Sequence, residues 1–166
     1  MHNRRQSFKE LRTFTVLDLE NQCGGSELVP AYAKEVKRQF KSLALPFPSQ
    51  TVIAVGSRAY SLYPQLSFDF REARILCRSG INGADICLCE VLINEAAAAR
   101  SKYVVIGSGD AMFAKPAAFL KAKGTNILVI GRRGSISSQL FKVANQVMYI
   151  DDKAFFAGST NIQSPL

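Results

Sequence analysis

The sequence predicts a three-layer α/β protein, in which a mainly parallel sheet of five to six strands carries helices on both faces. Apolar, β-branched runs of four to six residues alternate along the chain with helical patterns of ten or more residues. Such β-α-β repetition is typical of parallel strands joined by crossover helices. The length of 166 residues fits one domain that can bury a sizeable core.

The first half of the chain predicts three strands and one long helix. Residues 14–19 form the first strand, and Gly24-Gly25 then breaks the chain. Ser26 and Glu27 open a helix that has Pro30 in its first turns. Its expected core-facing residues follow helical spacing: Val29, Ala33, Val36, Phe40 and Leu43. Strands follow at 51–55 and 73–77, with a short helix or loop at 60–66 between them.

The second half predicts three helices and three more strands. A strong helix covers 84–100 and ends in an alanine run, and strands follow at 103–106, 126–130 and 146–150. A helix over 112–123 is closed by Gly124 as its C′ residue. Ser135 is expected to cap a last helix from 137 to about 144.

The boundaries of the domain follow from the same pattern. Residues 1–12 are polar and basic and predict a tail, 13–151 hold the whole α/β pattern, and 152–166 form a second tail. Phe155 and Phe156 leave open whether that last segment is an apolar clasp on another surface.

Composition indicates a soluble protein with a polyanionic partner. Hydrophobic residues make up 48% and charged residues 20%, and no apolar run is long enough to cross a bilayer. The N-terminus lacks the apolar core of a signal peptide, so we expect a cytoplasmic protein with no membrane partner. The net charge of +8 favours nucleic acid, although charge alone also serves solubility.

The rare residue types exclude several kinds of chemistry. The single histidine, His2, lies in the predicted tail, which argues against Ser-His-Asp hydrolases, Cys-His proteases and two-histidine ribonucleases. The four cysteines form no C-x-x-C pair, and Cys87 and Cys89 fall in an apolar helix pattern as small hydrophobes. Hydrolytic chemistry would therefore have to use carboxylates.

Three acids stand where such chemistry is expected. Asp18 and Asp110 each follow an apolar strand, and Asp85 lies in the first turn of a predicted helix. Each has a local explanation as a helix cap or as a partner of the helix dipole. Ligands of parallel α/β sheets bind at the carboxyl ends of the strands, however, and three acids meeting at that edge would suit a divalent metal. We therefore predict a metal site and phosphodiester chemistry.

Three ordered motifs around these acids resemble the NYN family of PIN-like nuclease domains. They are Val-Leu-Asp18-Leu-Glu20-Asn21, Gly83-Ala84-Asp85-Ile86-x-Leu88, and Ile106-Gly107-Ser108-Gly109-Asp110-x-x-Phe113. The segments 124–131 and 138–150 also resemble the strand after the third motif and the closing helix and strand of the family. The resemblance runs from about residue 13 to 151.

The resemblance implies a PIN-like fold and a ribonuclease that depends on Mg²⁺ or Mn²⁺. Asp18, Asp85 and Asp110 match the family's carboxylate cluster, with Glu20, Asn21 and Ser108 as supporting residues. Independently, Arg58, Arg132 and Arg133 follow strand ends on the same predicted edge, where they could bind an RNA backbone or simply be solvated loop charge.

The chain departs from the family at two positions that are often acidic. Val91 lies six residues after Asp85, and Met112 lies two residues after Asp110. Glu90 is displaced to another helix face, and Glu20 could compensate in part. A single metal remains possible with three acids, because Mg²⁺ needs only one or two direct carboxylates.

Two other functions fit the sequence less closely. The reduced acid set also suits a nucleic-acid-binding module that no longer cuts. Gly107-x-Gly109 and Gly131-Arg-Arg-Gly134 superficially suggest the phosphate loops of a nucleotide-binding α/β protein, but neither is G-x-G-x-x-G or a P-loop lysine motif. The sequence leaves open RNA against DNA and a monomer against a homodimer.

Overall fold

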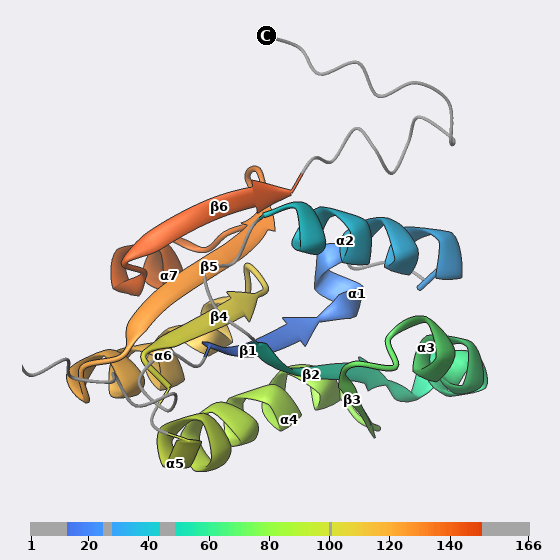
Figure 1. Ribbon diagram of the computed structural model, residues 1–166, viewed down its shortest axis with the longest axis horizontal. Coiled ribbons are helices and arrows are strands. Elements are labelled where there is room, and N and C mark those ends of the chain that lie inside the picture. Colours follow the sequence, from blue (N-terminus) through green and yellow to red (C-terminus); the bar gives the residue numbers. More distant parts are fainter. Residues whose placement is uncertain (1–12, 25–27, 44–48, 100, 151–166) are drawn as a thin grey trace, which may run out of the picture.

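The computed structural model describes residues 13–24, 28–43, 49–99 and 101–150, and it has the predicted α/β architecture (Figure 1). Six strands form one all-parallel sheet in the order β3-β2-β1-β4-β5-β6. The strands are β1 (Thr13–Asp18), β2 (Ser49–Gly56), β3 (Arg74–Arg78), β4 (Tyr103–Gly107), β5 (Asn126–Arg132) and β6 (Gln146–Ile150). In such an order the chain reverses its direction of growth between β1 and β4, which is the topological switch point of a doubly wound sheet.

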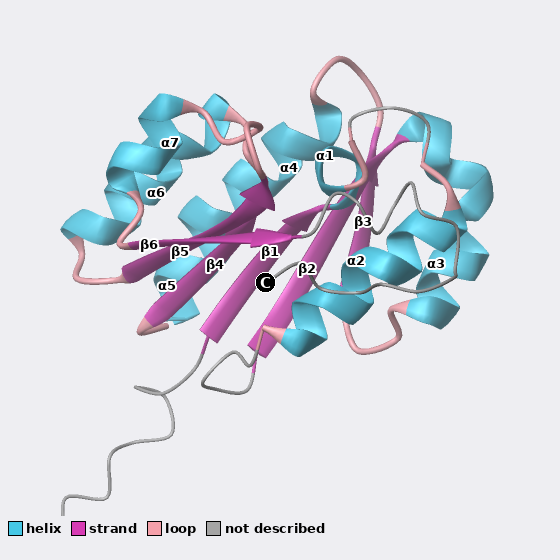
Figure 2. Ribbon diagram, turned by 90° about the horizontal axis from the view of Figure 1, so that it is seen from above, coloured by secondary structure: helices cyan, strands magenta, loops and turns pink. Residues whose placement is uncertain are grey.

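Helices cover both faces of the sheet, so the three-layer prediction is confirmed (Figure 2). One layer contains α4 (Gly83–Val91), a π-helical segment (Leu92–Ala96), α5 (Ala97–Ala99), α6 (Ala114–Ala122) and α7 (Ser138–Val143). The other contains α2 (Pro30–Ser42) and α3 (Tyr63–Asp69), while α1 (Leu19–Gln22) follows the end of β1. Two short 3₁₀ helices, Ser57–Leu62 and Ala111–Phe113, precede α3 and α6.

Alternation along the strands divides the core between the two faces. In β1, Phe14 and Val16 pack against the α4–α7 layer, whereas Leu17 packs under α2. Asp18 continues the first set, because side chains two residues apart in a strand share a face. The chain therefore directs Asp18 toward α4, and Asp85 lies in the first turn of that helix.

Several details predicted for the first long helix differ from the structure. The helix expected to open at Ser26 begins at Pro30; residues 25–27 lie outside the described ranges. Val29 precedes that helix and is 39% exposed, so it does not face the core, while Ala33 and Val36 are fully buried as predicted. Phe40 and Leu43 are only partly buried and pack against the core edge.

Two helix starts differ from the predicted ones. Ser137, not Ser135, caps α7, because its hydroxyl accepts the amide proton of Leu140 at 3.2 Å. The Ser135 hydroxyl instead donates to the Arg132 carbonyl at 2.8 Å and closes the turn before the helix. The helix expected over 112–123 opens as the 3₁₀ turn Ala111–Phe113, and Gly124 closes it with a φ of 90°, as predicted.

Within the described ranges, no helix is long and apolar enough to cross a membrane.

Candidate functional site

Asp18 lies at the carboxyl end of β1, where the sequence predicted it, and it is nearly inaccessible to solvent. Asp18 is 5% exposed. Its Oδ1 caps α1 by accepting the Asn21 amide proton at 3.1 Å. Its second oxygen accepts the Ser108 hydroxyl at 3.4 Å. Ser108 thus connects the ends of β1 and β4 across the switch point.

Asp85 reaches Asp18 from the first turn of α4. The pKa of Asp18 is raised to about 8, first by burial and then by hydrogen bonding with Asp85 and by the negative charge of Asp85, against the lowering effect of the Asn21 amide. Oδ1 of Asp85 is buried and has no hydrogen-bond partner among the described residues. The buried carboxyl group of Asp18 and the partly buried carboxyl group of Asp85 thus lie together, and one oxygen of Asp85 has no donor among the described residues.

Asp110 lies at the same edge, just after β4. Its Oδ1 accepts the Met112 amide proton at 2.7 Å, and so it caps the turn Ala111–Phe113. Its own amide donates to the Ser108 hydroxyl at 3.2 Å. Ser108 therefore contacts both strand-end acids.

Cys89, which the sequence did not assign to the site, lies among all three acids. The pKa of its thiol is raised to about 12, first by burial and then by the charges of Asp85, Asp110 and Asp18. The thiol donates to the Met112 carbonyl at 3.7 Å. The signal that could have found it is its spacing: it follows Asp85 by four residues, one turn later on the same helix face.

Asn21 and Glu20 support the site from the loop after Asp18. Oδ1 of Asn21 accepts the Gly109 amide proton at 3.0 Å, which ties this loop to the one that carries Asp110. Oε1 of Glu20 accepts the Gly56 amide proton at 3.0 Å, so Glu20 points to the end of β2. Its negative charge still raises the pKa of Asp18 to a small degree.

The three arginines lie on the predicted edge but on two sides of the acids. Exposed Arg58 lines a groove of about 1220 Å³ beside Glu20, Gly56 and Ile81. Arg132 folds back over the β1–α2 loop, where its guanidinium lies against Gly24 and lowers the pKa of Cys23 against the larger effect of burial. Arg133 stacks on the Tyr149 ring at 4.6 Å.

Val91 and Met112, which replace residues that are often acidic in the NYN family, have different surroundings. Val91 is 5% exposed and belongs to the core of the α4–α7 layer, so its side chain packs inward from α4. Glu90 pairs with Arg78 at 2.9 Å on the exposed surface. Met112 is 37% exposed beside Asp110, so an acid at that position would lie at the edge of the site.

A divalent cation fits this donor set as a mononuclear ion. Mg²⁺ and Mn²⁺ take carboxylate oxygens, and Mg²⁺ commonly uses one or two of them together with water. The partnerless oxygen of Asp85 and the close Asp18–Asp85 pair provide such donors. Within the described residues, no three His, Cys, Asp or Glu side chains are arranged to hold one ion together.

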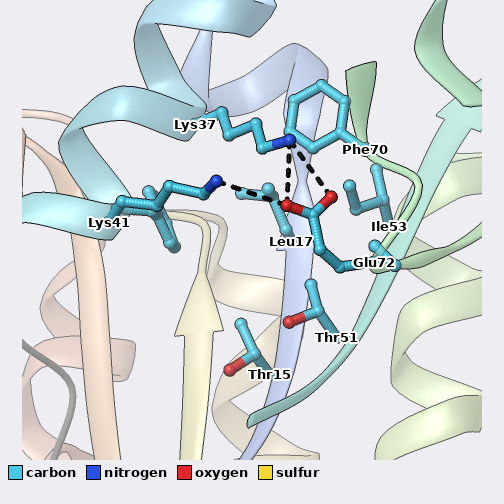
Figure 3. Close-up of a pocket in the computed structure, with 10 residues that line it drawn as sticks. Thr15, Leu17, Lys37, Lys41, Thr51, Ile53, Phe70 and Glu72 are labelled. Carbon is cyan, nitrogen blue, oxygen red and sulfur yellow. Dashed lines mark hydrogen bonds and ion pairs between the residues drawn. The ribbon is translucent and has the colours of Figure 1, made fainter. Parts of the chain in front are cut away.

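A cavity elsewhere in the molecule does not belong to this site. It has a volume of about 380 Å³ and lies under α2, over Thr15, Leu17, Thr51 and Ile53 (Figure 3). Lys37 and Lys41 at its mouth both pair with Glu72, at 3.1 and 3.3 Å. Leu17 and Asp18 point to opposite faces of the sheet, so this cavity is separated from the acid pair by the sheet itself.

Comparisons with known proteins show the fold alone. No family model and no curated protein matches the sequence. The chain is similar in structure to a protein of unknown function from Vibrio parahaemolyticus, with a TM-score of 0.66 and 15% identity over 89% of this chain and 97% of that one. The likeness supports the three-layer α/β architecture.

Proposed function

We propose that the chain is a metal-dependent ribonuclease of the NYN type, with Asp18 and Asp85 as the residues that hold Mg²⁺ or Mn²⁺. The observation that carries this proposal is the Asp18–Asp85 pair at the end of β1, in which Asp18 is buried and one buried oxygen of Asp85 has no partner among the described residues. Burying a carboxylate without a partner costs several kcal/mol, and a bound cation would remove that cost. A single ion held there would polarise a phosphodiester and activate water.

The other residues of the edge have supporting parts in this proposal. Asp110, held by Ser108 and the Met112 amide, orients water or a phosphate at the acid pair. Arg132 and Arg133 lie on the β5 side and would bind the phosphates of the backbone. RNA is preferred over DNA here because the motifs resemble a ribonuclease family. The cytoplasmic location is a separate proposal, which rests on the composition of the chain.

The nucleotide-binding alternative is weaker. The strand order is the one that dinucleotide-binding sheets use, with phosphate bound at the first βα turn. Here that turn contains Asp18 and Glu20 rather than a glycine-rich loop, and two carboxylates repel a pyrophosphate. The non-cutting nucleic-acid module is a stronger alternative, since Val91 and Met112 replace acids.

Neutralising single acids tests the proposal. Asp85→Asn and Asp110→Asn should each lower Mn²⁺-dependent cleavage of a labelled single-stranded RNA by ~10- to 100-fold, the scale of loss when a metal's surroundings are altered. Glu90→Gln is the matched control on α4, since Glu90 pairs with Arg78 on the surface, and it should keep full activity.

The same assay separates the alternatives. Cleavage that persists in EDTA, or that both Asn variants retain, would rule out the acid pair as a metal site. RNA binding by the wild type without any cleavage in Mg²⁺ or Mn²⁺ would select the non-cutting module instead.

A further inference from the structure

The charge of this chain is concentrated in one stretch. Residues 111–150 contain six of the 21 basic residues and none of the 13 acidic ones. The six are Lys115, Lys121, Lys123, Arg132, Arg133 and Lys142. This stretch forms α6, β5, α7 and β6, so its charge belongs to one end of the sheet and the helices over it (Figure 2).

Inside the described ranges, three of these cations have neutral partners. Lys121 donates to the Val143 carbonyl at 2.9 Å, Lys123 lies over the Phe119 ring at 4.9 Å, and Arg133 stacks on Tyr149. The ion pairs between described residues instead all join side chains within the range 34–95. The positive charge of α6 and α7 is therefore not cancelled by neighbouring acids of the described chain.

Large aromatic side chains are exposed on the same elements. Phe119 is 43% exposed, Phe141 52% and Tyr149 36%. Two of these rings have a cation over them: Lys123 lies over Phe119, and Arg133 stacks on Tyr149. Exposed Lys142 is the next residue after Phe141 in α7. Exposed rings interleaved with Lys and Arg are what single-stranded nucleic acid requires, because unpaired bases stack on rings while cations follow the backbone.

This surface begins at the acids. The Ser137 amide donates to the Gly109 carbonyl at 2.9 Å, so the start of α7 lies against the residue before Asp110. The helix α6 starts four residues after Asp110 and contacts α7, as the Lys121–Val143 hydrogen bond shows. A strand bound at the acid pair can thus continue over either helix without leaving the basic region.

We propose that the exposed side of α6 and α7, together with exposed β6 residue Tyr149, is a second binding surface for single-stranded RNA. We call it the α6–α7 surface; it comprises Lys115, Phe119, Lys121, Lys123, Phe141, Lys142 and Tyr149. It holds the strand on the β5 side of the acids, outside the reacting phosphate. The part it plays in cleavage rests on the proposed ribonuclease function, whereas its affinity for RNA does not.

Binding without cleavage tests the surface separately from the nuclease. Fluorescence anisotropy in EDTA would compare a 25-nucleotide single strand, a 5-nucleotide strand and a 25-base-pair duplex. Lys115→Glu/Lys142→Glu should weaken binding of the long single strand by ~10-fold or more and make its salt dependence shallower by at least about 1.4 in log–log slope, since each phosphate contact contributes about 0.7. Lys34→Glu/Arg71→Glu changes the net charge equally at exposed positions outside residues 111–150 and should have much less effect.

A second pair of variants tests stacking. Phe141→Ala should weaken binding of the long single strand by roughly 10-fold without changing the salt slope, whereas Phe68→Ala, at a 72% exposed ring of α3, should not. Lys115→Gln/Lys142→Gln replaces the reversal variant if circular dichroism shows that the latter is unfolded.

Three results would overturn the proposal. They are equal losses in the two charge-reversal variants, a duplex bound as tightly as the single strand, and no binding of the long strand even at low salt. Failure of metal-dependent cleavage with these binding results intact would remove the nuclease and leave the surface.

Discussion

At the scale of single residues, Asp18 lowers the stability of the fold, although the proposed metal site requires it. It is nearly fully buried, its pKa is raised to about 8 by burial and by Asp85, and no described cation lies close enough to form an ion pair with it. A core residue chosen for stability would be neutral or paired. The chain thus keeps an acid that costs stability at neutral pH, which is common at functional sites.

The pH dependence of stability follows from the sign of that shift. The folded state keeps a proton on Asp18 that the unfolded state releases above the ordinary pKa of 3.8, so the stability that this group contributes is present at low pH and is lost as pH rises toward about 8. In EDTA at pH 8, the free energy of unfolding of Asp18→Asn should therefore exceed that of the wild type by ~2 kcal/mol, which raises the melting temperature by roughly 4–8 °C. Near pH 4 the two proteins should melt at nearly the same temperature.

Thermal melts of both proteins between pH 4 and pH 9 provide the measurement. The comparison with wild type matters because Glu72, whose pKa is lowered to about 2 by hydrogen bonds to its own backbone and to Lys37 and Lys41, contributes in the opposite direction at low pH in both proteins. A melting difference that stays constant with pH would show that Asp18 does not titrate as described.

Some of the site residues could be predicted from the sequence and others could not. Asp18 and Asp110 were predictable because each ends an apolar strand, and parallel strands end at one edge. The orphaned oxygen of Asp85 and the place of Cys89 were not, since both depend on how α4 lies over the sheet. The direction of Glu20 toward Gly56 likewise depends on contacts 36 residues apart.

At the scale of elements, the loop between β5 and α7 is positioned by direct contact with the loop after β4. A Cβ placed on Gly109 would lie 2.2 Å from the Ser135 carbonyl oxygen and 2.7 Å from its carbon, so the two backbones touch. Local patterns predicted both loops but not this contact, which also explains the error about Ser135: its turn is fixed by packing, and Ser137 becomes the cap.

Gly109→Ala should separate those loops. Because the obstacle is backbone rather than a flexible side chain, we expect a loss of ~1–3 kcal/mol in stability together with reduced metal-dependent cleavage, since Asp110 is the next residue. Chemical denaturation and the RNA cleavage assay provide the two readouts.

Gly124→Ala is the matched control for that change. Gly124 has a φ of 90° with nothing within 4 Å of a new Cβ, so the substitution costs only the left-handed backbone term of ~1–2 kcal/mol and should leave cleavage unchanged. Equal activity of the two variants would contradict a role for the Gly109–Ser135 contact at the site.

At the scale of the whole molecule, each face of the sheet has a core, and the described members of these cores lie between residues 14 and 150. One core extends from Phe14 to Leu140 under α4–α7, and the other from Leu17 to Ile150 under α2 and α3. The three-layer arrangement was predictable because alternation of short strands and long helices permits few other solutions. The basic residues of 111–150 are gathered on one part of the molecule because the strand order places β5 and β6 at one end of the sheet.

A shortened chain of residues 13–151 tests the predicted domain and the location of the RNA-binding charge together. Since both cores remain, it should fold with an unchanged circular dichroism spectrum and melt within about 3 °C of the full chain, the scale of ~1 kcal/mol in a protein of this size. Removing 1–12 takes away four basic residues and one acid, whereas all six basic residues of 111–150 are kept.

The affinity of the shortened chain for the long single strand then shows whether the folded domain or the N-terminal tail contributes most of the binding free energy. If the α6–α7 surface and the arginines of the β5 side carry it, affinity at 150 mM salt should fall only several-fold, because tail charges contribute a screened, non-specific attraction. A drop to the level of the Lys115→Glu/Lys142→Glu variant would instead assign the interaction to the N-terminal tail, and the folded domain would then contribute shape and the acid pair but little of the affinity for RNA.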